Sequence, residues 1–401
     1  FGVYPGFSWM PNNREIVVWS QGKIKKIDTQ SSQVTEVPFQ VETTIKIAEA
    51  QHANSKVFTE EFNPKVLRHA VTSPDGKTLV FNAVGHLWKK ELPQGKPERI
   101  TKAEEFEFEP SFSPDGKSIV YVTWSDKEMG AVRRIDLNGR NAKKLTSEKG
   151  IFRNPSFSGD GKMIVFNKED GNSDLGQAFT KNPGIYLMTA SGENMKKITD
   201  KGEFPMFTAD DKRIFFQTGG YLFGSLTKKL HSVDLSGNNE RTHVESKYGG
   251  RLVPSPDNKW IAFSNLHKAY IAPLMMTGKP VTIEPGTKTI PVRQIAKDAG
   301  INLHWSNNSQ NVHWILGDEY FTNDVAQRFT FLKDSPDSIP PITEKGTPIG
   351  LEVKTDVPTG QIAFTNARII TMDDDLQHDP ADIPRMIDCL RSGADVCYVQ
   401  F

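Results

Sequence analysis

A ten-residue phrase that recurs along the chain constrains the fold more than any other feature. Its clearest form is Ser-Pro-Asp-Gly-Lys followed by an apolar strand, as in TSPDGKTLVF from Thr72 and FSPDGKSIVY from Phe112. Seven versions occur, and their turn residues are Asn12, Asp75, Asp115, Asp160, Asp210, Asp257 and Asn308. The first interval is 63 residues and the later ones are 40 to 51. The later intervals agree with the period of a propeller blade, roughly 40–50 residues.

The phrase has a physical reason to form a turn between two strands. Proline fixes φ, Asp or Asn bonds the backbone that follows, and glycine tolerates positive φ. The β-branched and aromatic residues that come next, such as Thr78–Phe81 and Ser118–Tyr121, are typical of a buried strand. A second strand, a glycine turn and a third strand follow in each copy. This order predicts a β-meander that an outer or inner fourth strand completes.

We therefore predict an all-β fold, a β-propeller of six to eight blades, each a four-stranded antiparallel sheet. A single meander cannot bury a core alone, whereas radially arranged sheets cover one another and leave only short edges. A sandwich with scattered hairpin turns and a β-solenoid are the alternatives, and seven copies in near register disfavour both. The segment 39–66, in the long first interval, indicates a loop inserted between blades.

Composition argues against two classes of protein. The chain has 49 Lys and Arg residues against 49 Asp and Glu residues, a balance that disfavours nucleic-acid binding. Apolar stretches such as Tyr270–Met276 fall far short of the ~18 residues of a transmembrane helix. Both cysteines, Cys389 and Cys397, lie near the end of the chain, a usage that suits an exported bacterial protein. Because the chain starts at Phe1 without signal-peptide features, we expect a removed leader or a longer parent protein.

The repeat phrase, with blades that close in Asp-Leu-x-Gly and a Leu/Ile-Thr strand, resembles the TolB-type (WD40-like) propeller repeat from about Val3 to Trp314. Longer stretches resemble the propeller found in front of bacterial amidohydrolases: YPGFSW from Tyr4, FEFEPSFSPDGKSIVYVTW from Phe106, PVRQIAKDAG from Pro291 and NLHWSNNSQNVHW from Asn302. The segment PTGQIAFTNARIITM, Pro358 to Met372, resembles the first strand of the β-sandwich that opens such a hydrolase.

This resemblance implies a TolB-like propeller at 1–335, a linker at 336–358 and the first sandwich strand at 359–372. It also implies a parent enzyme that hydrolyses C–N bonds with a divalent metal, zinc, held in a (β/α)₈ barrel. The ligands of that barrel begin with His-x-His, and no two of the nine histidines here are separated by one residue. We therefore expect no complete catalytic site and no cofactor in this chain. The propeller would be a substrate-gating or interaction domain for peptide-like small substrates, periplasmic or secreted.

The last residues, MDDDLQHDPADIPRMIDCLRSGADVCYVQF from Met372, resemble an α/β-like fragment of a family-2 glycosyltransferase. In that family an Asp-x-Asp motif holds Mg²⁺ or Mn²⁺ against a nucleotide-sugar diphosphate. Carried over to this chain, the metal ligands would be Asp373 and Asp375. The nucleotide-binding half that should precede them is missing, so we expect 373–401 not to form an independent domain. The junction at Met372 and Asp373 is typical of a joint between two unrelated genes.

Two alternative functions remain open. One is a stand-alone periplasmic interaction propeller, and the other is a glycosyltransferase remnant acting through Asp373 and Asp375. The remaining motifs are interpreted as structural. Gly-Lys-Ser/Thr after Asp75 and Asp115 lacks the earlier glycine of a phosphate loop. DGNSD at 170–174 lacks the glycine and closing glutamate of a calcium loop. The histidines His86, His231 and His313 are interpreted as wall or surface residues of the blades.

Overall fold

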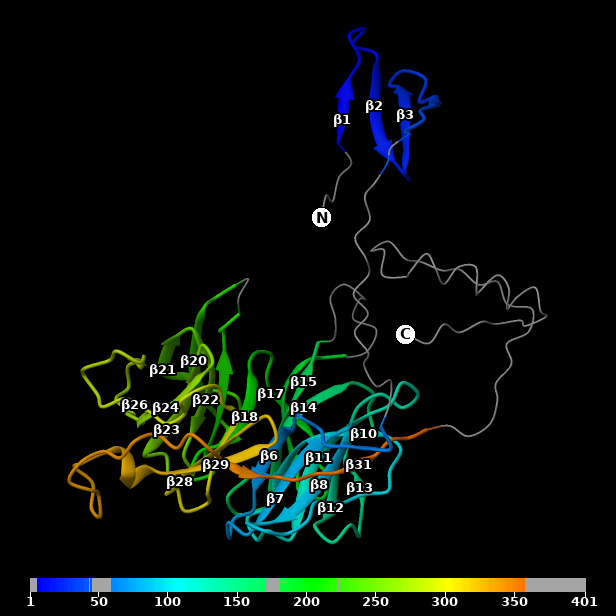
Figure 1. Ribbon diagram of the computed structural model, residues 1–401. Coiled ribbons are helices and arrows are strands. Elements are labelled where there is room, and N and C mark those ends of the chain that lie inside the picture. Colours follow the sequence, from blue (N-terminus) through cyan, green and yellow to red (C-terminus); the bar gives the residue numbers. More distant parts are fainter. Residues whose placement is uncertain (1–5, 43, 45–58, 171–180, 222–223, 358–401) are drawn as a thin grey trace. The chain divides into compact units, whose positions relative to one another are not determined.

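The computed structural model describes residues 6–42, 44, 59–170, 181–221 and 224–357 (Figure 1). Within these residues every regular element is a β-strand, apart from one short 3₁₀ turn, η2 (Val325–Arg328). The predicted all-β propeller class is thereby confirmed. The chain divides into two compact units, one of residues 1–57 and 358–401 and one of residues 58–357. The segments predicted at 359–372 and 373–401 lie outside the described residues.

The first unit contains one described sheet. Its strands β1 (Phe7–Trp9), β2 (Glu15–Ser20), β3 (Lys23–Asp28) and β4 (Val34–Val37) pair antiparallel in chain order. Asn12 lies in the turn between β1 and β2, where its side-chain oxygen accepts hydrogen bonds from the backbone of Arg14 and Glu15. The first version of the repeat phrase therefore forms the strand order that the other versions also form.

The second unit contains six blades, each with its strands hydrogen-bonded in chain order. Blade 1 has β6 (Arg68–Thr72), β7 (Thr78–Ala83), β8 (His86–Glu91) and β9 (Glu98–Arg99), and blade 2 has β10 (Phe106–Phe112), β11 (Ser118–Trp124), β12 (Ala131–Asp136) and β13 (Lys143–Lys144). Blade 3 has β14 (Ile151–Phe157), β15 (Met163–Glu169), β16 (Gly184–Thr189) and β17 (Lys196–Thr199), and blade 4 has β18 (Glu203–Phe207), β19 (Arg213–Thr218), β20 (Thr227–Asp234) and β21 (Arg241–Lys247). Blade 5 has β22 (Gly249–Pro254), β23 (Trp260–Asn265), β24 (Lys268–Pro273) and β26 (Arg293–Gln294), and blade 6 has β27 (Ile301–Trp305), β28 (Asn311–Leu316), β29 (Glu319–Asp324) and β30 (Thr347–Pro348). The short β25 (Val281–Thr282) pairs parallel with β21 at the edge of blade 4.

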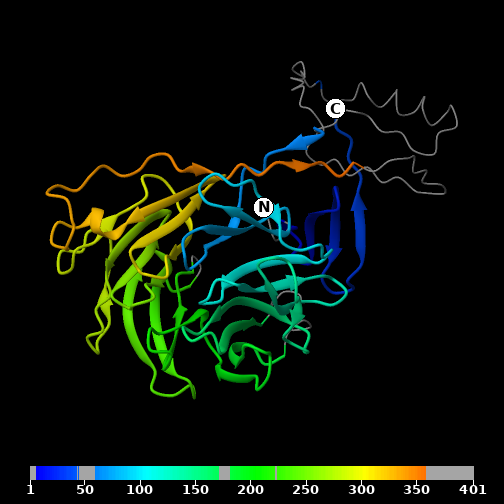
Figure 2. The same ribbon diagram turned by 90° about the horizontal axis from the view of Figure 1, so that it is seen from below.

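The first strand of each blade lies at the centre of the ring. Strand β10 contacts β6 and β14, β14 contacts β18, and β27 contacts both β6 and β22. The blades follow one another around this centre in chain order (Figure 2). The sequence left open whether the fourth strand of a blade is outer or inner. It is the inner strand, and it precedes the repeat phrase.

The ring closes between blade 6 and blade 1. Leu67, Leu79 and Phe81 pack there in one apolar cluster with Ile315 and Ile349. Residues 347–354, in the segment that we expected to be a linker, supply β30 and β31 (Val353–Lys354). Strand β31 pairs antiparallel with β5 (Glu61–Phe62), so the two ends of the unit are hydrogen-bonded to each other.

The repeat phrase forms the same capped turn in each blade. In blade 1 the Ser73 hydroxyl donates to the Asp75 carboxylate at 2.6 Å and accepts from the backbone N–H of Thr78 at 2.8 Å. The same hydroxyl-to-Asp or hydroxyl-to-Asn contact recurs in the other five blades, from Ser113, Ser158, Thr208, Ser255 and Ser306. The strand after the turn is buried, as predicted for Thr78–Phe81 and Ser118–Tyr121.

Candidate functional site

Each blade places one residue from its first strand at the same point of the repeat, next to the centre of the ring. This residue precedes the Ser or Thr that opens the repeat phrase by four positions. We call the six the axial residues: His69, Glu109, Asn154, Phe204, Arg251 and Asn302. In every blade the pairing of first and second strands shifts register at or beside this residue. Such bulges re-aim side chains and are common next to binding sites.

Backbone conformation also marks these positions. Five axial residues have φ values between 50° and 56°: His69, Glu109, Asn154, Phe204 and Asn302. This left-handed region is uncommon for residues other than glycine and costs roughly 1–2 kcal/mol per residue. Strain of this kind collects at functional sites, where the surrounding structure holds it. Because positive φ recurs at this position in five of the six blades, the centre of the ring is the candidate functional site.

Charged side chains connect the axial residues of blades 1 to 3. The Glu109 carboxylate accepts a hydrogen bond from Arg153 Nε at 2.7 Å and one from the backbone N–H of Asn154 at 2.6 Å. His69 Nε2 lies 4.0 Å from the same carboxylate. Arg153 Nη1 also lies 3.3 Å from Glu169 at the end of β15. One arginine thus holds two carboxylates at the axis.

Aromatic and charged side chains meet where blades 4 and 5 adjoin. The guanidinium carbon of Arg251 lies 3.6 Å from the centroid of the Phe204 ring. Lys228 Nζ lies 5.5 Å from the same centroid and forms an ion pair with Glu203. Both cations are therefore within the range of a cation–π interaction with one ring.

The pKa values distinguish the two axial arginine environments. Burial disfavours the charge of Arg153, but the hydrogen bond to Glu109 and the attraction of the carboxylates of Glu109, Glu169 and Glu203 together outweigh it, and the pKa of Arg153 is raised. Burial lowers the pKa of Arg251 to about 10, although the charges of Glu203 and Glu109 oppose the shift. Burial also raises the pKa of Glu169, against the attraction of Arg153. The charge of Arg153 is therefore well compensated, and that of Arg251 is not.

Three axial side chains carry a buried polar atom that has no hydrogen-bond partner among the described residues. These atoms are Nδ1 of His69, Nη1 of Arg251 and Oδ1 of Asn302. Buried polar atoms in proteins are nearly always hydrogen-bonded, to protein, water or ligand. The centre of the ring therefore offers charge, an aromatic face and unused hydrogen-bonding capacity to a bound polar molecule.

The six-bladed ring is similar to a known protein family. The model of the TolB β-propeller domain matches residues 43–277, from before blade 1 to the end of β24 and a few residues beyond. The chain belongs to the TolB β-propeller family. The matched residues include the repeat phrases with turn residues Asp75, Asp115, Asp160, Asp210 and Asp257.

Solved structures similar to this TolB-type propeller include two TolB proteins. TolB from Acinetobacter baumannii is 18% identical, with 79% of this chain and 75% of that chain covered and a TM-score of 0.44. A putative TolB from Agrobacterium tumefaciens is 20% identical, with coverages of 59% and 80% and a TM-score of 0.35. An oligogalacturonate lyase from Vibrio parahaemolyticus is 10% identical, with coverages of 76% and 84% and a TM-score of 0.43.

On the closure side of the TolB-type ring, neutral side chains take the place of ion pairs. His304 Nδ1 lies 2.7 Å from the carbonyl oxygen of Asn302, which can only accept, so this nitrogen carries the proton of the neutral ring. His304 Nε2 then accepts from the Thr72 hydroxyl at 2.8 Å. Thr72 in turn accepts from the Tyr320 hydroxyl at 2.9 Å. A directed chain of hydrogen bonds thus joins blade 6 to blade 1.

His313 is the last residue of this chain of hydrogen bonds. Its Nδ1 lies 2.7 Å from the Tyr320 oxygen and 2.9 Å from Thr322 Oγ1, and its Nε2 is buried without a partner among the described residues. The proton order assigned above makes Nδ1 the donor to Tyr320. Burial lowers the pKa of His304 to about 4, and burial together with His304 lowers the pKa of His313 as well. The predicted wall role of His313 agrees with these contacts.

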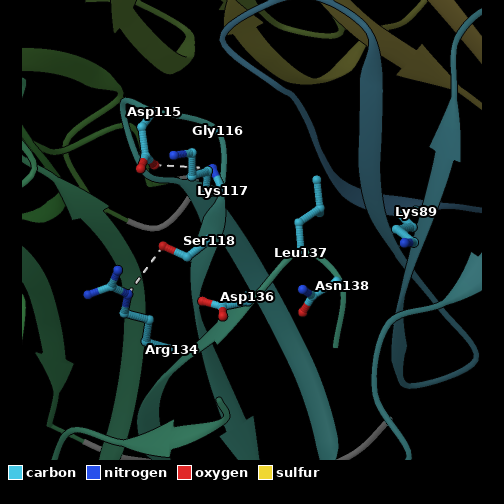
Figure 3. Close-up of a pocket in the computed structure, with 9 residues that line it drawn as sticks. All are labelled: Lys89, Asp115, Gly116, Lys117, Ser118, Arg134, Asp136, Leu137 and Asn138. Atoms are coloured by element: carbon cyan, nitrogen blue, oxygen red, sulfur yellow. Dashed lines mark hydrogen bonds between the residues drawn. The ribbon is translucent and has the colours of Figure 1, made fainter. Parts of the chain in front are cut away.

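A groove of about 550 Å³ lies away from the axis, between strand β8 of blade 1 and two turns of blade 2 (Figure 3). The close-up shows Asp115 hydrogen-bonded to Lys117 and Arg134 hydrogen-bonded to Ser118. Ser113 also donates to Asp115 at 2.6 Å. The carboxylate therefore serves the turn itself, and this is the structural role that the sequence predicted for the Gly-Lys-Ser motif.

The residues predicted as metal ligands, Asp373 and Asp375, lie outside the described residues, as do positions 171–174 of DGNSD. Within the described ranges no group of three His, Cys, Asp or Glu side chains could hold a metal ion. None of the helices described is long and apolar enough to cross a membrane. Sequence reasoning missed the axial residues, although their constant offset from the repeat phrase was a signal that could have found them.

Proposed function

We propose that the six-bladed unit is a binding module whose ligand site is formed by the axial residues. The observation that carries this proposal is the set of unpartnered buried atoms on His69, Arg251 and Asn302. These residues come from blades 1, 5 and 6, so a single polar ligand at the axis would complete hydrogen bonds to three blades. Ligand binding would also explain why strained backbone recurs at this place.

The paired charges at the axis suit recognition better than proton transfer. Glu109 accepts hydrogen bonds from Arg153 and from the backbone of Asn154, and Glu203 is paired with Lys228. A general base must instead have a lone pair within reach of the proton that it removes. These carboxylates are better placed to fix cations around a ligand than to react with it.

We further propose that this module serves an exported amidohydrolase-type enzyme, for which it gates or docks peptide-like small substrates. The support is the resemblance of Pro291–Gly300, Asn302–Trp314 and Pro358–Met372 to proteins of that arrangement. Zinc would belong to the hydrolase barrel, where neutral histidines would hold the metal and the metal would acidify a bound water. The module's partner would then be its own hydrolase domain, in the periplasm or outside the cell.

A stand-alone interaction propeller is the second candidate, and the TolB family match favours it. In this alternative the ring would bind a periplasmic protein. A defined envelope protein that is captured by the full chain, and released when the axial residues are altered, would favour this candidate over the first.

Ligand-observed NMR on the full chain, with a panel of N-acetylated dipeptides as free acids and amides, tests the binding module. The informative variant is Asn302→Gly, because glycine tolerates φ of 56° and the amide oxygen that it removes has no hydrogen-bond partner among the described residues. We expect wild-type saturation transfer to weaken in Asn302→Gly without loss of stability. The matched control is Lys117→Gln in the outer groove, which should bind as wild type does. Binding that is lost only in the control would overturn the axial site.

Metal analysis with an amidase screen tests the assignment of catalysis to a separate domain. We expect neither a stoichiometric metal nor turnover of acyl amides from this chain alone. A stoichiometric metal together with turnover would contradict that assignment. For the glycosyltransferase alternative, calorimetry with a nucleotide sugar and Mn²⁺ should show no binding, and binding that is lost in Asp375→Ala would revive it.

A further inference from the structure

Arg251 differs from the other arginine at the axis in having no carboxylate partner in the part of the chain that the structure describes. Arg153 lies 2.7 Å from Glu109 and 3.3 Å from Glu169. Among the residues that the structure describes, no carboxylate oxygen lies within ion-pair distance of Arg251. Its Nη1 is buried without a hydrogen-bond partner. The axis therefore holds one guanidinium that is satisfied and one that is not.

The surroundings of Arg251 fix its orientation without using its hydrogen bonds. The guanidinium is stacked on Phe204, whose φ of 54° is uncommon for an aromatic residue. A stacked guanidinium keeps its N–H groups in the plane of the fork, where they can donate to an acceptor at the edge. The strained backbone of Phe204 thus places a platform beneath an arginine whose side-chain N–H groups form no hydrogen bond among the described residues.

The local charge limits what this fork can bind. Three carboxylates, those of Glu109, Glu169 and Glu203, lie at the axis with the cations Arg153, Lys228 and Arg251. Arg251 alone is left without an ion pair among them. The formal charges of these six side chains sum to zero, so a planar anion of single charge that fits the Arg251 fork is favoured over a doubly charged phosphate, which the neighbouring carboxylates would repel more strongly. The chemistry favours a carboxylate.

An exposed aromatic side chain adjoins the same cluster. Tyr221 is 56% exposed, and its ring centroid lies 5.7 Å from Lys228 Nζ. Aromatic side chains of this kind contribute apolar contact area to ligand sites. An apolar group attached to the carboxylate could therefore pack near Tyr221 and Phe204.

We propose that Arg251 binds the free C-terminal carboxylate of a short peptide-like ligand. The proposal rests on the proposed binding function of the axial residues and adds the chemical class of the ligand. Arg251 supplies the paired donors, Phe204 holds the guanidinium in place, and Tyr221 contacts the last side chain. The affinity of the ring should therefore depend on whether the ligand ends in an acid or in an amide.

Calorimetry on the full chain with acetyl-Ala-Ala-Phe, as free acid and as C-terminal amide, tests this proposal. We expect the acid to bind at least about tenfold more tightly than the amide, since charge-assisted bonds to a carboxylate are about twice as strong as neutral ones. Arg251→Gln should remove this preference while amide binding persists. Arg251→Lys, which keeps the charge but loses the fork, should retain part of the preference. The matched control is Arg241→Gln, at an exposed position of β21 in the edge region of blade 4.

The outcomes separate this proposal from the proposed function. If acid and amide bind equally well to the wild type, the carboxylate proposal is overturned and the binding module stands. If neither peptide binds but glucuronate binds in an Arg251-dependent manner, a carboxylate is recognised and the peptide class is wrong. If Asn302→Gly and Arg251→Gln leave all binding unchanged, both proposals fail. Thermal unfolding of each variant shows whether it is folded, and Arg251→Lys serves as the measurement if Arg251→Gln is not.

Discussion

The two sides of the ring centre use their inner side chains for different purposes. On the side of blades 2 to 5, Glu109, Arg153 and Arg251 bring charge to the axis. On the closure side, Thr72, His304 and Tyr320 form a neutral hydrogen-bonded chain from blade 6 to blade 1. A partly exposed charge, such as that of Arg153 with 41% of its side chain exposed, can meet a ligand, whereas a buried neutral chain mainly holds blades together. The comparison teaches that one ring centre can combine charged side chains suited to a ligand with neutral side chains that join neighbouring blades.

The largest expected effect is on the closure side, where apolar packing seals the ring. Phe81 is fully buried in the cluster that joins blades 1 and 6. Phe81→Ala should lower the free energy of unfolding by about 3–5 kcal/mol because it leaves a cavity in a close-packed core. Urea unfolding followed by fluorescence measures the change. The matched control, Phe106→Ala at a residue that is 51% exposed, should cost less than about 1 kcal/mol. If the two variants lose equal free energies of unfolding, the buried cluster between blades 1 and 6 contributes no more to stability than an exposed residue does.

Acid should weaken the closure side next, through its buried neutral histidines. The pKa of His304 is lowered to about 4 in the folded protein, while an unfolded histidine titrates near 6.5. Between these values the unfolded state binds a proton that the folded state does not, so stability falls as pH decreases from 6.5 to 4. The loss from His304 would approach about 3 kcal/mol at pH 4.

Urea unfolding at pH 7, 5.5 and 4 measures this slope. His304→Asn should show a shallower pH dependence than the wild type, and His267→Asn, at an exposed histidine, should not. If the wild type and His304→Asn share one slope, the neutral chain does not control the acid response of the ring.

The smallest effect is expected on the charged side. Glu169 and Arg153 are paired at 3.3 Å, with side chains that are 38% and 41% exposed. Solvent screens such a pair, so Glu169→Gln should change the free energy of unfolding by less than about 1 kcal/mol. The difference should shrink further in 0.5 M NaCl, as salt screens exposed charges. A salt-insensitive loss of about 2 kcal/mol or more would mean that the charged side also holds the ring together.

The turns and the strands after them could be predicted from the sequence because their cause is local. Ser73, Asp75 and Gly76 form their turn within a few residues, and Leu79–Phe81 is buried in whatever sheet follows. The inner strands could not be assigned in this way. RHAVT in β6 and EFPMF in β18 share no pattern of residues, and their place at the axis depends on contacts between blades.

The axial site could not be predicted from local sequence either, because it is formed by contacts between blades. Glu109 and Arg153 are 44 residues apart, close to one repeat, and only the ring brings them into contact. Nothing in the local sequence of Arg251 indicates that it lacks a carboxylate partner within the described part of the chain, since that depends on every side chain around it. The predicted ligands Asp373 and Asp375, which lie outside the described residues, stay a prediction.

The pairing of β5 with β31 also has a consequence for how such a ring can be moved between proteins. Thr355 N–H donates to the carbonyl oxygen of Glu60 at 2.9 Å, so the chain enters and leaves the ring at one place. A unit with adjacent ends can be placed within another polypeptide without stretching the host chain. The six blades could therefore be gained or lost in evolution as one unit, by insertion or deletion at a single site of a host protein.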